Sequence, residues 1–311
     1  MNYYDCHADT LTQIPEPENL MHNTCCLDLA RVRSFADHYT QIFAIWHDQN
    51  EIQKAQAQTE AVFQKLYERA LQLMLEQSAY AVWCQNAEDM KKAHAQGKAA
   101  IFLSVEDVSV MGTMVEQIRD LGFRFAALSW NYENPYGCGA VSGQEKGLTK
   151  EGRMLVKKLA SQQIVLDLSH LSDQGVDDVL GLTSSPVLAS HSDVREVCAH
   201  PRNLNREHIR ELIARNGLLG INFYKEFVAK QPDPDVSQLL GHLDAVLALG
   251  GGEILALGGD FDGCGPQMVH GIEGVQSIPY LWEEMERAFG KVMTEKIFWK
   301  NADRFLTEVL R

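Results

Sequence analysis

The chain alternates short runs of apolar, β-branched and aromatic residues with longer stretches in which apolar residues recur every three or four positions. The short runs predict buried strands, and the longer stretches predict amphipathic helices. Eight strands are predicted, at residues 2–7, 41–46, 99–105, 124–130, 164–169, 186–190, 217–223 and 254–259. Helices are predicted between them, at residues 52–77, 87–96, 150–161, 173–180, 205–215 and 236–249.

Strands that alternate with helices predict a mostly parallel sheet, and eight such units in a chain of this length predict a (β/α)8 TIM barrel. An open doubly wound sheet is the alternative, but no early strand is followed by the glycine-rich turn of a nucleotide-binding fold. Residues 277–311 are more than one closing helix needs, so extra C-terminal helices are predicted. The sequence shows no linker and no internal repeat, and residues 1–311 are therefore predicted to form a single domain.

Composition narrows the class of partner. The 311 residues are 45% hydrophobic and 23% charged, with a formal net charge of −14. This charge argues against nucleic acid or an anionic membrane surface as a partner, since both require clustered positive charge. A small-molecule substrate is favoured instead. The N-terminal residues lack a signal-peptide pattern and no apolar run is long enough to span a membrane, so a cytoplasmic location is expected.

The first predicted strand ends in a pair of metal-type ligands. His7 and Asp9 are two residues apart, so an extended backbone directs both side chains to the same side. Such a pair also occurs by chance in a chain of this length. The seven cysteines include no C-x-x-C pair, which favours reduced thiols and argues against a structural zinc site built from cysteines.

Later strands end in residues of the same chemical kind. Glu106 follows the third strand, His170 the fifth, His191 the sixth and Asp260 the eighth. In a TIM barrel the active site lies at the C-terminal ends of the strands, so these side chains are expected to meet. Imidazole and carboxylate ligands suit zinc, manganese or cobalt. The number of ligands predicts two divalent ions that share a water and polarise a carbonyl group, which suits hydrolysis of an acyl bond.

Six sequence motifs together resemble the membrane (renal) dipeptidase family of the amidohydrolase superfamily. The motifs lie in unbroken order at residues 7–9, 105–106, 147–152, 166–170, 190–192 with 201–203, and 258–263. The resemblance covers about residues 3–305 and implies a zinc-dependent dipeptidase that acts on free dipeptides with an L- or D-residue at the C-terminal position. It implies a homodimer as well. Among family members, the chain looks most similar to the soluble bacterial ones.

The resemblance also implies a role for each matching residue. His7 and Asp9 would bind one zinc ion, His170 and His191 the other, and Glu106 would bridge the two. Asp260 would take a proton from the bridging water and pass it to the leaving amine. In addition, Arg202 would hold the C-terminal carboxylate of the substrate, because its planar fork of donors matches a carboxylate. A surface salt bridge is the structural alternative for Arg202.

One residue departs from the family pattern. The mammalian members have a histidine at the end of the fourth strand that contacts the substrate, and Trp130 occupies that position here. Tryptophan offers an apolar face and a single N–H donor, so it cannot act as a charged donor to an oxyanion. Asn131 or Tyr132 is therefore expected to supply the missing hydrogen bond, unless Trp130 only packs at the rim.

Two other functions fit the same barrel. A lactonase, deaminase or phosphotriesterase is one, although many of those enzymes bridge their metals with a carboxylated lysine on the fourth strand, where this chain has Trp130 and Asn131. A non-catalytic barrel is the other, and it predicts the loss of at least one ligand, whereas all five are present.

Overall fold

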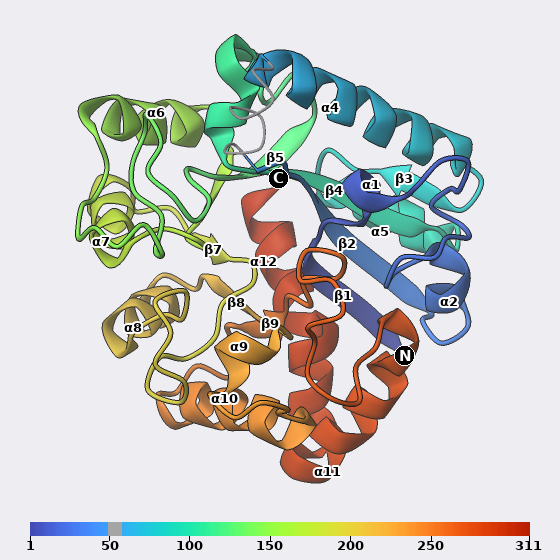
Figure 1. The fold of residues 1–311 in the computed structure, drawn as a ribbon. Coiled ribbons are helices and arrows are strands. Elements are labelled where there is room, and N and C mark those ends of the chain that lie inside the picture. Colours follow the sequence, from blue (N-terminus) through green and yellow to red (C-terminus); the bar gives the residue numbers. More distant parts are fainter. Residues whose placement is uncertain (49–57) are drawn as a thin grey trace.

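A closed parallel barrel organises the molecule (Figure 1). The computed structural model describes residues 1–48 and 58–311. In that part of the chain nine strands form one sheet: β1 (Asn2–Ala8), β2 (His38–Ile45), β3 (Ala81–Trp83), β4 (Ala99–Glu106), β5 (Phe123–Ala127), β6 (Val165–Asp167), β7 (Leu188–Ala189), β8 (Leu218–Ile221) and β9 (Leu255–Leu257).

Eight of these strands form the barrel. Neighbours pair in the order β2-β1-β9-β8-β7-β6-β5-β4, and parallel pairing of β2 with β4 closes the ring. The remaining strand, β3, pairs only with the first half of β4, from Ala81 beside Ala99 to Trp83 beside Ile101. Since β5 begins its pairing with β4 at Leu103, β3 extends the sheet below the barrel strands without entering the ring. The (β/α)8 prediction is confirmed, but β3 was not predicted because it has only three residues.

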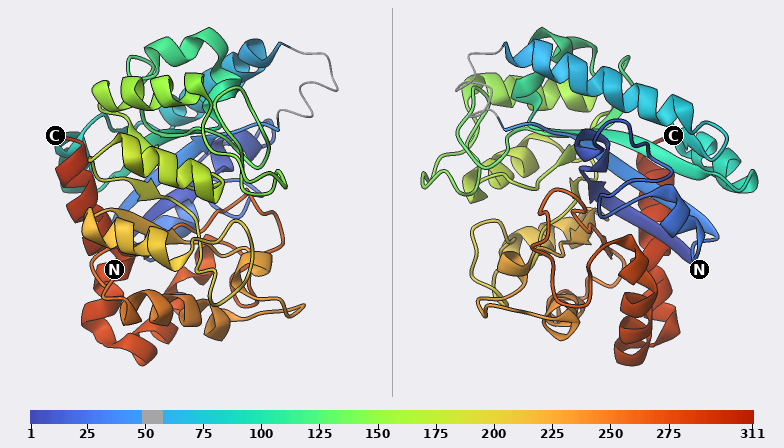
Figure 2. Two further views of the ribbon diagram at one scale, coloured as in Figure 1. Left: turned by 90° about the vertical axis from the view of Figure 1, so that its left-hand side faces the viewer. Right: turned by 45° about the vertical axis from the view of Figure 1, so that its right-hand side comes forward.

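Helices surround the barrel and contact its strands from outside (Figures 1 and 2). The α-helices are α1 (Thr10–Gln13), α2 (Leu29–Arg33), α4 (Thr59–Glu76), α5 (Ala87–Ala95), α6 (Lys150–Ser161), α7 (Asp173–Leu182), α8 (Arg206–Ala214), α9 (Lys225–Val228), α10 (Val236–Ala248), α11 (Ile278–Glu295) and α12 (Asn301–Val309). Two 3₁₀ segments, η1 (Val108–Gln117) and η2 (Val275–Ser277), and a π-helical turn, η3 (Lys296–Lys300), complete the set.

Side-chain caps fix where the barrel helices start. Asn86, Thr149, Ser172 and Asn205 each accept a hydrogen bond from the backbone N–H three residues further on, at the starts of α5, α6, α7 and α8. These bonds satisfy donors that the first helical turn leaves unpaired. Helix α4 begins at Thr59, and the first six residues of the predicted helix 52–77 lie outside the described residues.

Side chains fill the inside of the barrel at the end opposite to the C-terminal ends of the strands. Side chains of the strands, including Tyr4, Phe102 and Phe125, pack there against Phe305 and Leu306 of α12. Figure 1 shows α12 across the centre of the ring, and Figure 2 shows it on the opposite side from the long loops that follow the strands. The predicted extra C-terminal helices are thus present, and one of them closes the bottom of the barrel.

Each barrel strand is buried nearly throughout, because helices cover the outside and side chains fill the inside. Several observed strands are shorter than predicted: the strand predicted at 124–130 stops at Ala127, and the strand predicted at 186–190 spans only Leu188–Ala189. β1 and β4 instead extend one residue beyond their predicted ends, to Ala8 and Glu106. All seven cysteines are free thiols, as predicted. In residues 1–48 and 58–311, no helix combines the length and apolar character that a membrane span requires.

Candidate metal centre and active site

The strand ends bring the five predicted metal ligands together at one rim of the barrel. His7 and Asp9 lie at the end of β1, and Glu106 is the last residue of β4. His170 and His191 follow β6 and β7 by three and two residues. All five side chains are buried. Residues separated by up to 184 positions in the sequence therefore contribute to one cluster, because parallel strands carry their carboxyl ends to the same edge.

Glu106 lies at the centre of this cluster. Its Oε2 is 3.0 Å from Nε2 of His7, and its Oε1 is 2.5 Å from Nε2 of His170. Nε2 of His191 is 3.8 Å from the same Oε1 and 2.8 Å from Nε2 of His170. The two oxygens of one carboxylate thus face imidazoles from opposite sides of the barrel.

Two more carboxylates lie beside His7. Asp9 Oδ2 and Asp260 Oδ1 are 3.5 Å and 3.9 Å from Nε2 of His7. The other oxygen of Asp260, Oδ2, accepts a hydrogen bond of 3.1 Å from Nδ2 of Asn222, which follows β8. Asn222 therefore orients the Asp260 carboxyl so that Oδ1 faces the histidines.

The buried atoms of this site fit a divalent cation. Nε2 of His7 and Oδ1 of Asp9 are buried and have no hydrogen-bond partner among the described residues. A ligand atom from each of His7, Asp9 and Asp260 lies within 4.8 Å of the other two, and the same is true of His7, Glu106 and His191. Buried polar atoms without partners are costly in a folded protein. A cation between them would compensate that cost, because imidazole nitrogens and carboxylate oxygens are its preferred ligands.

Burial and mutual charge shift the pKa of each group in the cluster. Burial raises the pKa of Asp260 to about 7 and that of Asp9 to about 6, and in both cases the Glu106 carboxylate adds to the rise. Burial opposes ionisation of Glu106 too, but His170 and His7 outweigh it and hold its pKa well below the ordinary value. Burial together with the Arg202 cation lowers the pKa of His170 to about 4. Burial opposes protonation of His7, but Glu106 and Asp9 outweigh it and raise the pKa of this imidazole well above its ordinary value. Since a metal ion binds only a neutral imidazole, metal binding at His7 would release a proton.

The backbone at this rim adopts conformations that most residues avoid. His170 has φ 69° and Asp260 has φ 55°, both in the left-handed region. Hydrogen bonds hold these residues there: the amide of Asp260 donates to the carbonyl of His7 at 3.1 Å, and the amide of Ala140 donates to that of His170 at 2.7 Å. Strained residues that the surrounding structure holds in place cluster at functional sites.

Gly263 leaves the space that two of the carboxylates occupy. A Cβ atom at this position would lie 2.1 Å from Oδ1 of Asp260 and 2.2 Å from Oδ2 of Asp9. Any side chain would therefore displace both groups, and a glycine is required by close approach.

Arg202 is buried near the site but does not line its cavity. Only 3% of the residue is exposed, and Nη2 donates to the backbone oxygen of His191 at 3.3 Å. The guanidinium carbon lies 5.3 Å from the ring centre of Phe227, and Nε has no hydrogen-bond partner among the described residues. Burial lowers the pKa of Arg202 to about 10, although nearby carboxylates oppose this effect. The surface salt bridge considered from the sequence does not describe this arginine.

A cavity of about 250 Å³ opens above the ligands. Four candidate site residues, Glu106, Asp9, Asp260 and His170, line it together with four aromatic residues. The aromatic residues are Trp46, Trp130, Tyr224 and Phe227. The rings of Trp46 and Trp130 are 5.0 Å apart. Trp130 therefore lines the cavity and also packs against Trp46 at the rim, and its contact with the substrate stays a prediction.

Asn131 also lines the cavity, but its side chain contacts a predicted ligand. Its Oδ1 lies 2.9 Å from Nδ1 of His170. This contact orients the His170 ring, since an amide oxygen accepts a hydrogen from Nδ1 and leaves Nε2 free to bind a metal. Asn131 thus has an orienting contact that the sequence did not predict, beside its predicted place near the substrate.

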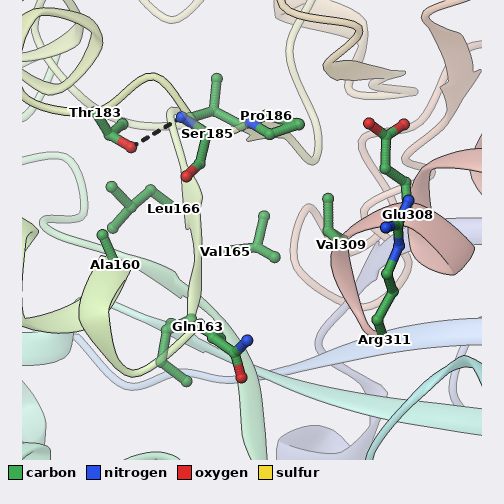
Figure 3. Close-up of a pocket in the computed structure, with 12 residues that line it drawn as sticks. Ala160, Gln163, Val165, Leu166, Thr183, Ser185, Pro186, Glu308, Val309 and Arg311 are labelled. Carbon is green, nitrogen blue, oxygen red and sulfur yellow. Dashed lines mark hydrogen bonds between the residues drawn. The ribbon is translucent and has the colours of Figure 1, made fainter.

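A second cavity, of about 350 Å³, lies near the C-terminal residues of the chain (Figure 3). Figure 3 shows it between Leu166, Val165 and Val309, with Glu308 and Arg311 at one side and a hydrogen bond from the amide of Ser185 to Thr183 at the other. Its lining residues include no histidine or cysteine and a single carboxylate. The candidate metal ligands are therefore at the barrel rim and not in this second cavity.

Sequence analysis missed several residues of this site. Asn222 directly follows β8, but the search of strand ends was for metal ligands and acids, and an amide gave no such signal. The sequence around Trp46, Tyr224 and Phe227 has no feature that distinguishes them from other apolar residues. Their approach to the cavity depends on the loops that follow β2 and β8, and the spacing of residues did not reveal it.

Comparison with known proteins gives the family. The family model described as membrane dipeptidase (peptidase family M19) matches residues 1–311. An uncharacterized dipeptidase of Schizosaccharomyces pombe is 32% identical over 195 residues, which are 60% of this chain and 46% of that relative, so the match spans about half of the relative's length.

Solved structures share the fold. A metallopeptidase of Rhodobacter sphaeroides, solved with a phosphinate mimic of the dipeptide L-Ala-D-Ala, superposes with a TM-score of 0.86 at 23% identity, over 100% of this chain and 99% of the other. The probable dipeptidase PvdM of Pseudomonas aeruginosa gives a TM-score of 0.84 at 16% identity, over 100% and 96% of the two chains. At these identities the structures show the fold alone. The match of the family model to the whole chain, together with the predicted motifs, shows that this protein belongs to the membrane dipeptidase family, peptidase family M19.

Proposed function

We propose that this protein is a dipeptidase that holds two divalent metal ions, most readily zinc, and hydrolyses free dipeptides. One observation carries the proposal: Glu106 presents Oε2 to His7 at 3.0 Å and Oε1 to His170 at 2.5 Å. A carboxylate placed between two histidines in this way can serve two ions at once. Membership in peptidase family M19 supports the choice of a peptide bond as the substrate group.

In this proposal His7 and Asp9 hold one ion, His170 and His191 hold the other, and Glu106 contacts both. The unpartnered atoms Nε2 of His7 and Oδ1 of Asp9 support the first half of that assignment. When bound, divalent ions at such a site lower the pKa of water and polarise a scissile carbonyl group. Side chains of the protein would transfer the proton and hold the substrate.

Asp260 is the proposed acid and base. Its Oδ2 is engaged by Asn222, so Oδ1, which lies 3.9 Å from Nε2 of His7, is the oxygen that can accept a proton from the attacking water and return it to the leaving amine. A general acid or base must lie within hydrogen-bond reach of the atom it serves. The place of Asp260 beside His7 and in the lining of the same cavity as Glu106 supports this role.

Arg202 is the proposed anchor for the C-terminal carboxylate of the substrate. A buried guanidinium with an unpartnered N–H is costly, and a carboxylate is the group that best offsets this cost. Phe227, which lines the cavity, packs against the guanidinium. The substrate carboxylate would therefore reach Arg202 at the Phe227 side of the cavity.

The cavity also limits what can bind. A space of about 250 Å³ suits a dipeptide better than a long peptide, and the Trp46 and Trp130 rings offer apolar contacts to a side chain. The Rhodobacter protein was solved with a mimic of L-Ala-D-Ala, so we include L-Xaa-D-Xaa dipeptides with L-Xaa-L-Xaa dipeptides among the proposed substrates.

Metal analysis combined with a substrate panel tests this function. The purified protein is assayed for bound metals, stripped with a chelator, reconstituted with Zn²⁺, and given L-L and L-D dipeptides alongside their C-terminal amides. We expect two ions per chain, loss of hydrolysis on stripping, recovery with Zn²⁺, and poor turnover of the amides. Hydrolysis of lactones, organophosphates or amino-purines in place of dipeptides would replace the proposal with another amidohydrolase activity.

We further propose that residues 1–311 act as one domain and that two chains form a homodimer. Strands from β1 to β9 and helix α12 complete a single barrel, which supports the first point. The resemblance to the family supports the second. Light scattering of the purified protein gives the mass of the assembly, and a monomer at micromolar concentration would contradict the dimer.

A further inference from the structure

A buried serine contacts two of the proposed ligand histidines on the side that faces away from the cavity. Oγ of Ser190 lies 2.7 Å from Nδ1 of His191 and 3.4 Å from Nδ1 of His7. The opposite nitrogens of these rings, their Nε2 atoms, face Glu106 at 3.8 Å and 3.0 Å. Each imidazole therefore lies between the Ser190 hydroxyl and the cluster of candidate ligands around Glu106.

The hydrogen-bond partners of Ser190 determine which way its own proton points. Oγ of Ser190 is 2.5 Å from Oδ2 of Asp167, the last residue of β6. The other oxygen of Asp167, Oδ1, accepts from the backbone amides of Ser169 and Ser190, each at 3.0 Å. An ionised carboxylate only accepts hydrogen bonds, whereas a hydroxyl donates one and accepts two. The Ser190 hydroxyl thus donates to Asp167 and accepts from both imidazoles.

This arrangement fixes the tautomer of each ring. If Ser190 can only accept from Nδ1 of His7 and Nδ1 of His191, both Nδ1 atoms carry a hydrogen, and in the neutral form of each ring Nε2 is left with a free lone pair toward the site. Asn131 imposes the same tautomer on His170 by a separate contact of 2.9 Å. The lone pairs of His170 and His191 then face each other across 2.8 Å, an arrangement that a cation stabilises.

We propose that Ser190 and Asp167 are positioning residues that set the metal-binding tautomers of His7 and His191 together, so that one hydroxyl serves both metal sites. The inference rests on the proposed assignment of His7 to one ion and His191 to the other. The position of Ser190 is well fixed: only 1% of it is exposed, and a Cβ on Gly258 would come within 1.8 Å of its carbonyl oxygen.

Asp167→Asn is the sharpest test because it changes hydrogen bonding with little change in shape. Two backbone amides already point at Oδ1, so the carbonyl oxygen of the asparagine must occupy that place and its NH₂ group must face Ser190. Ser190 then accepts from the asparagine and donates to Nδ1 of His191. The imidazole hydrogen moves from Nδ1 to Nε2, and the ring stays neutral but can no longer bind a metal through Nε2.

Two readouts that do not depend on peptide hydrolysis examine this change in the full chain. The first is Zn²⁺ affinity, measured by titrating metal-free protein in competition with a coloured chelator. The second is the set of imidazole ¹⁵N shifts of the metal-free protein, which differ between the two tautomers; single His7→Gln and His191→Gln variants assign the signals. We expect Asp167→Asn to lower the affinity for the ion that His191 binds by roughly 10- to 100-fold, the usual effect of removing an outer hydrogen-bond partner. The signals of His191 should shift to the Nε2–H form.

Two further variants serve as a control and a contrast. Ser192→Ala removes another fully buried hydroxyl from the same loop, one that contacts Ser169 at 3.3 Å and no imidazole, so Zn²⁺ affinity should stay at the wild-type level. Asn131→Ala should weaken only the ion that His170 binds, whereas Ser190→Ala should weaken both. This contrast also tests the inference if Asp167→Asn does not fold.

The outcomes separate this inference from the proposed function. If Asp167→Asn folds and keeps both wild-type affinity and wild-type imidazole shifts, the inference is wrong. It is also wrong if Ser190→Ala weakens one ion alone, as Asn131→Ala does. A wild-type chain that binds no Zn²⁺ would instead overturn the proposed metal-dependent function.

Discussion

The two ends of the barrel each contain a buried histidine among hydroxyl and carboxylate groups, yet only at the rim does such a histidine have a ring nitrogen without a hydrogen-bond partner among the described residues. Beneath the barrel, His94 of α5 lies 3.3 Å from the hydroxyl of Tyr4 through Nδ1, and its Nε2 lies 3.1 Å from the hydroxyl of Thr40. The Tyr4 hydroxyl donates to Asp303 at 3.1 Å. At the rim, Nε2 of His7 and Oδ1 of Asp9 have no such partner among the described residues.

This difference separates a structural network from the proposed metal site. The His94 network satisfies its own hydrogen bonds and ties α5, β1 and α12 together, so it needs no ligand. The rim leaves buried atoms unpaired, crowds three carboxylates and holds His170 and Asp260 at positive φ. Residue type alone does not distinguish the two ends, because both contain histidine and aspartate. The two ends differ in whether the atoms of these histidine and aspartate side chains have hydrogen-bond partners.

Replacing the central carboxylate should have the largest effect. Glu106→Gln removes the charge that faces both histidine sets, so we expect loss of bound metal and a fall in kcat/KM of at least about 10³-fold, since metal ions contribute several kcal/mol to such reactions. Metal content and kinetics are measured together. Asp9→Asn is the comparison and should be milder, because Asp9 serves one ion. Equal losses in the two variants would argue against a shared Glu106.

Replacing the proposed acid and base should come next. Asp260→Asn should retain metals and fold but lower kcat by roughly 10²- to 10⁴-fold, the usual contribution of general acid–base catalysis. Asp262→Asn is the matched control: its oxygens already accept from Thr10 and from the amide of Cys26, both at 2.6 Å, so it should affect stability more than turnover. Wild-type turnover in Asp260→Asn would remove this residue from the mechanism.

Loss of the buried guanidinium should have a smaller effect that depends on the substrate. Arg202→Ala should lower kcat/KM on the order of 10- to 100-fold for free dipeptides, since a hydrogen bond to a charged group contributes roughly 1.5 to 3 kcal/mol. Dipeptide amides should lose much less, because they lack the carboxylate. Equal losses for both substrates would show that Arg202 acts only through its contact with the His191 carbonyl.

The smallest expected effect concerns the other end of the barrel. Burial lowers the pKa of His94 in the folded protein, so the unfolded chain binds its proton more tightly. Stability should therefore rise with pH through the region near and below about pH 6.5, where the unfolded histidine titrates, and should fall as the pH drops. Urea unfolding of metal-free protein at pH 7.5 and pH 5.5 measures this slope, and His94→Gln should reduce it. An unchanged slope in the variant would show that His94 does not contribute to it.

The sequence predicted most of the fold because periodicity is a local property. Buried strands such as β4, apolar from Ala99 to Leu103, and capped helices such as α6, from Lys150 to Ser161, leave clear patterns. The short strand β3 left none, since three residues are too few for periodicity. Strand ends such as Ala127 differed from prediction because tertiary pairing, and not the apolar run, determines where a ladder stops.

The same distinction between local pattern and tertiary structure applies to the candidate site. The sequence by itself determined which candidate ligands stand at strand ends, namely His7, Asp9, Glu106, His170 and His191, because strand direction carries them to one rim. Only the tertiary structure decided which atoms meet, and it alone shows Asn222 on Asp260, Asn131 on His170 and Ser190 between two imidazoles. Those contacts join residues from different loops and strands. Their geometry depends on how the barrel closes, which no local pattern of residues encodes.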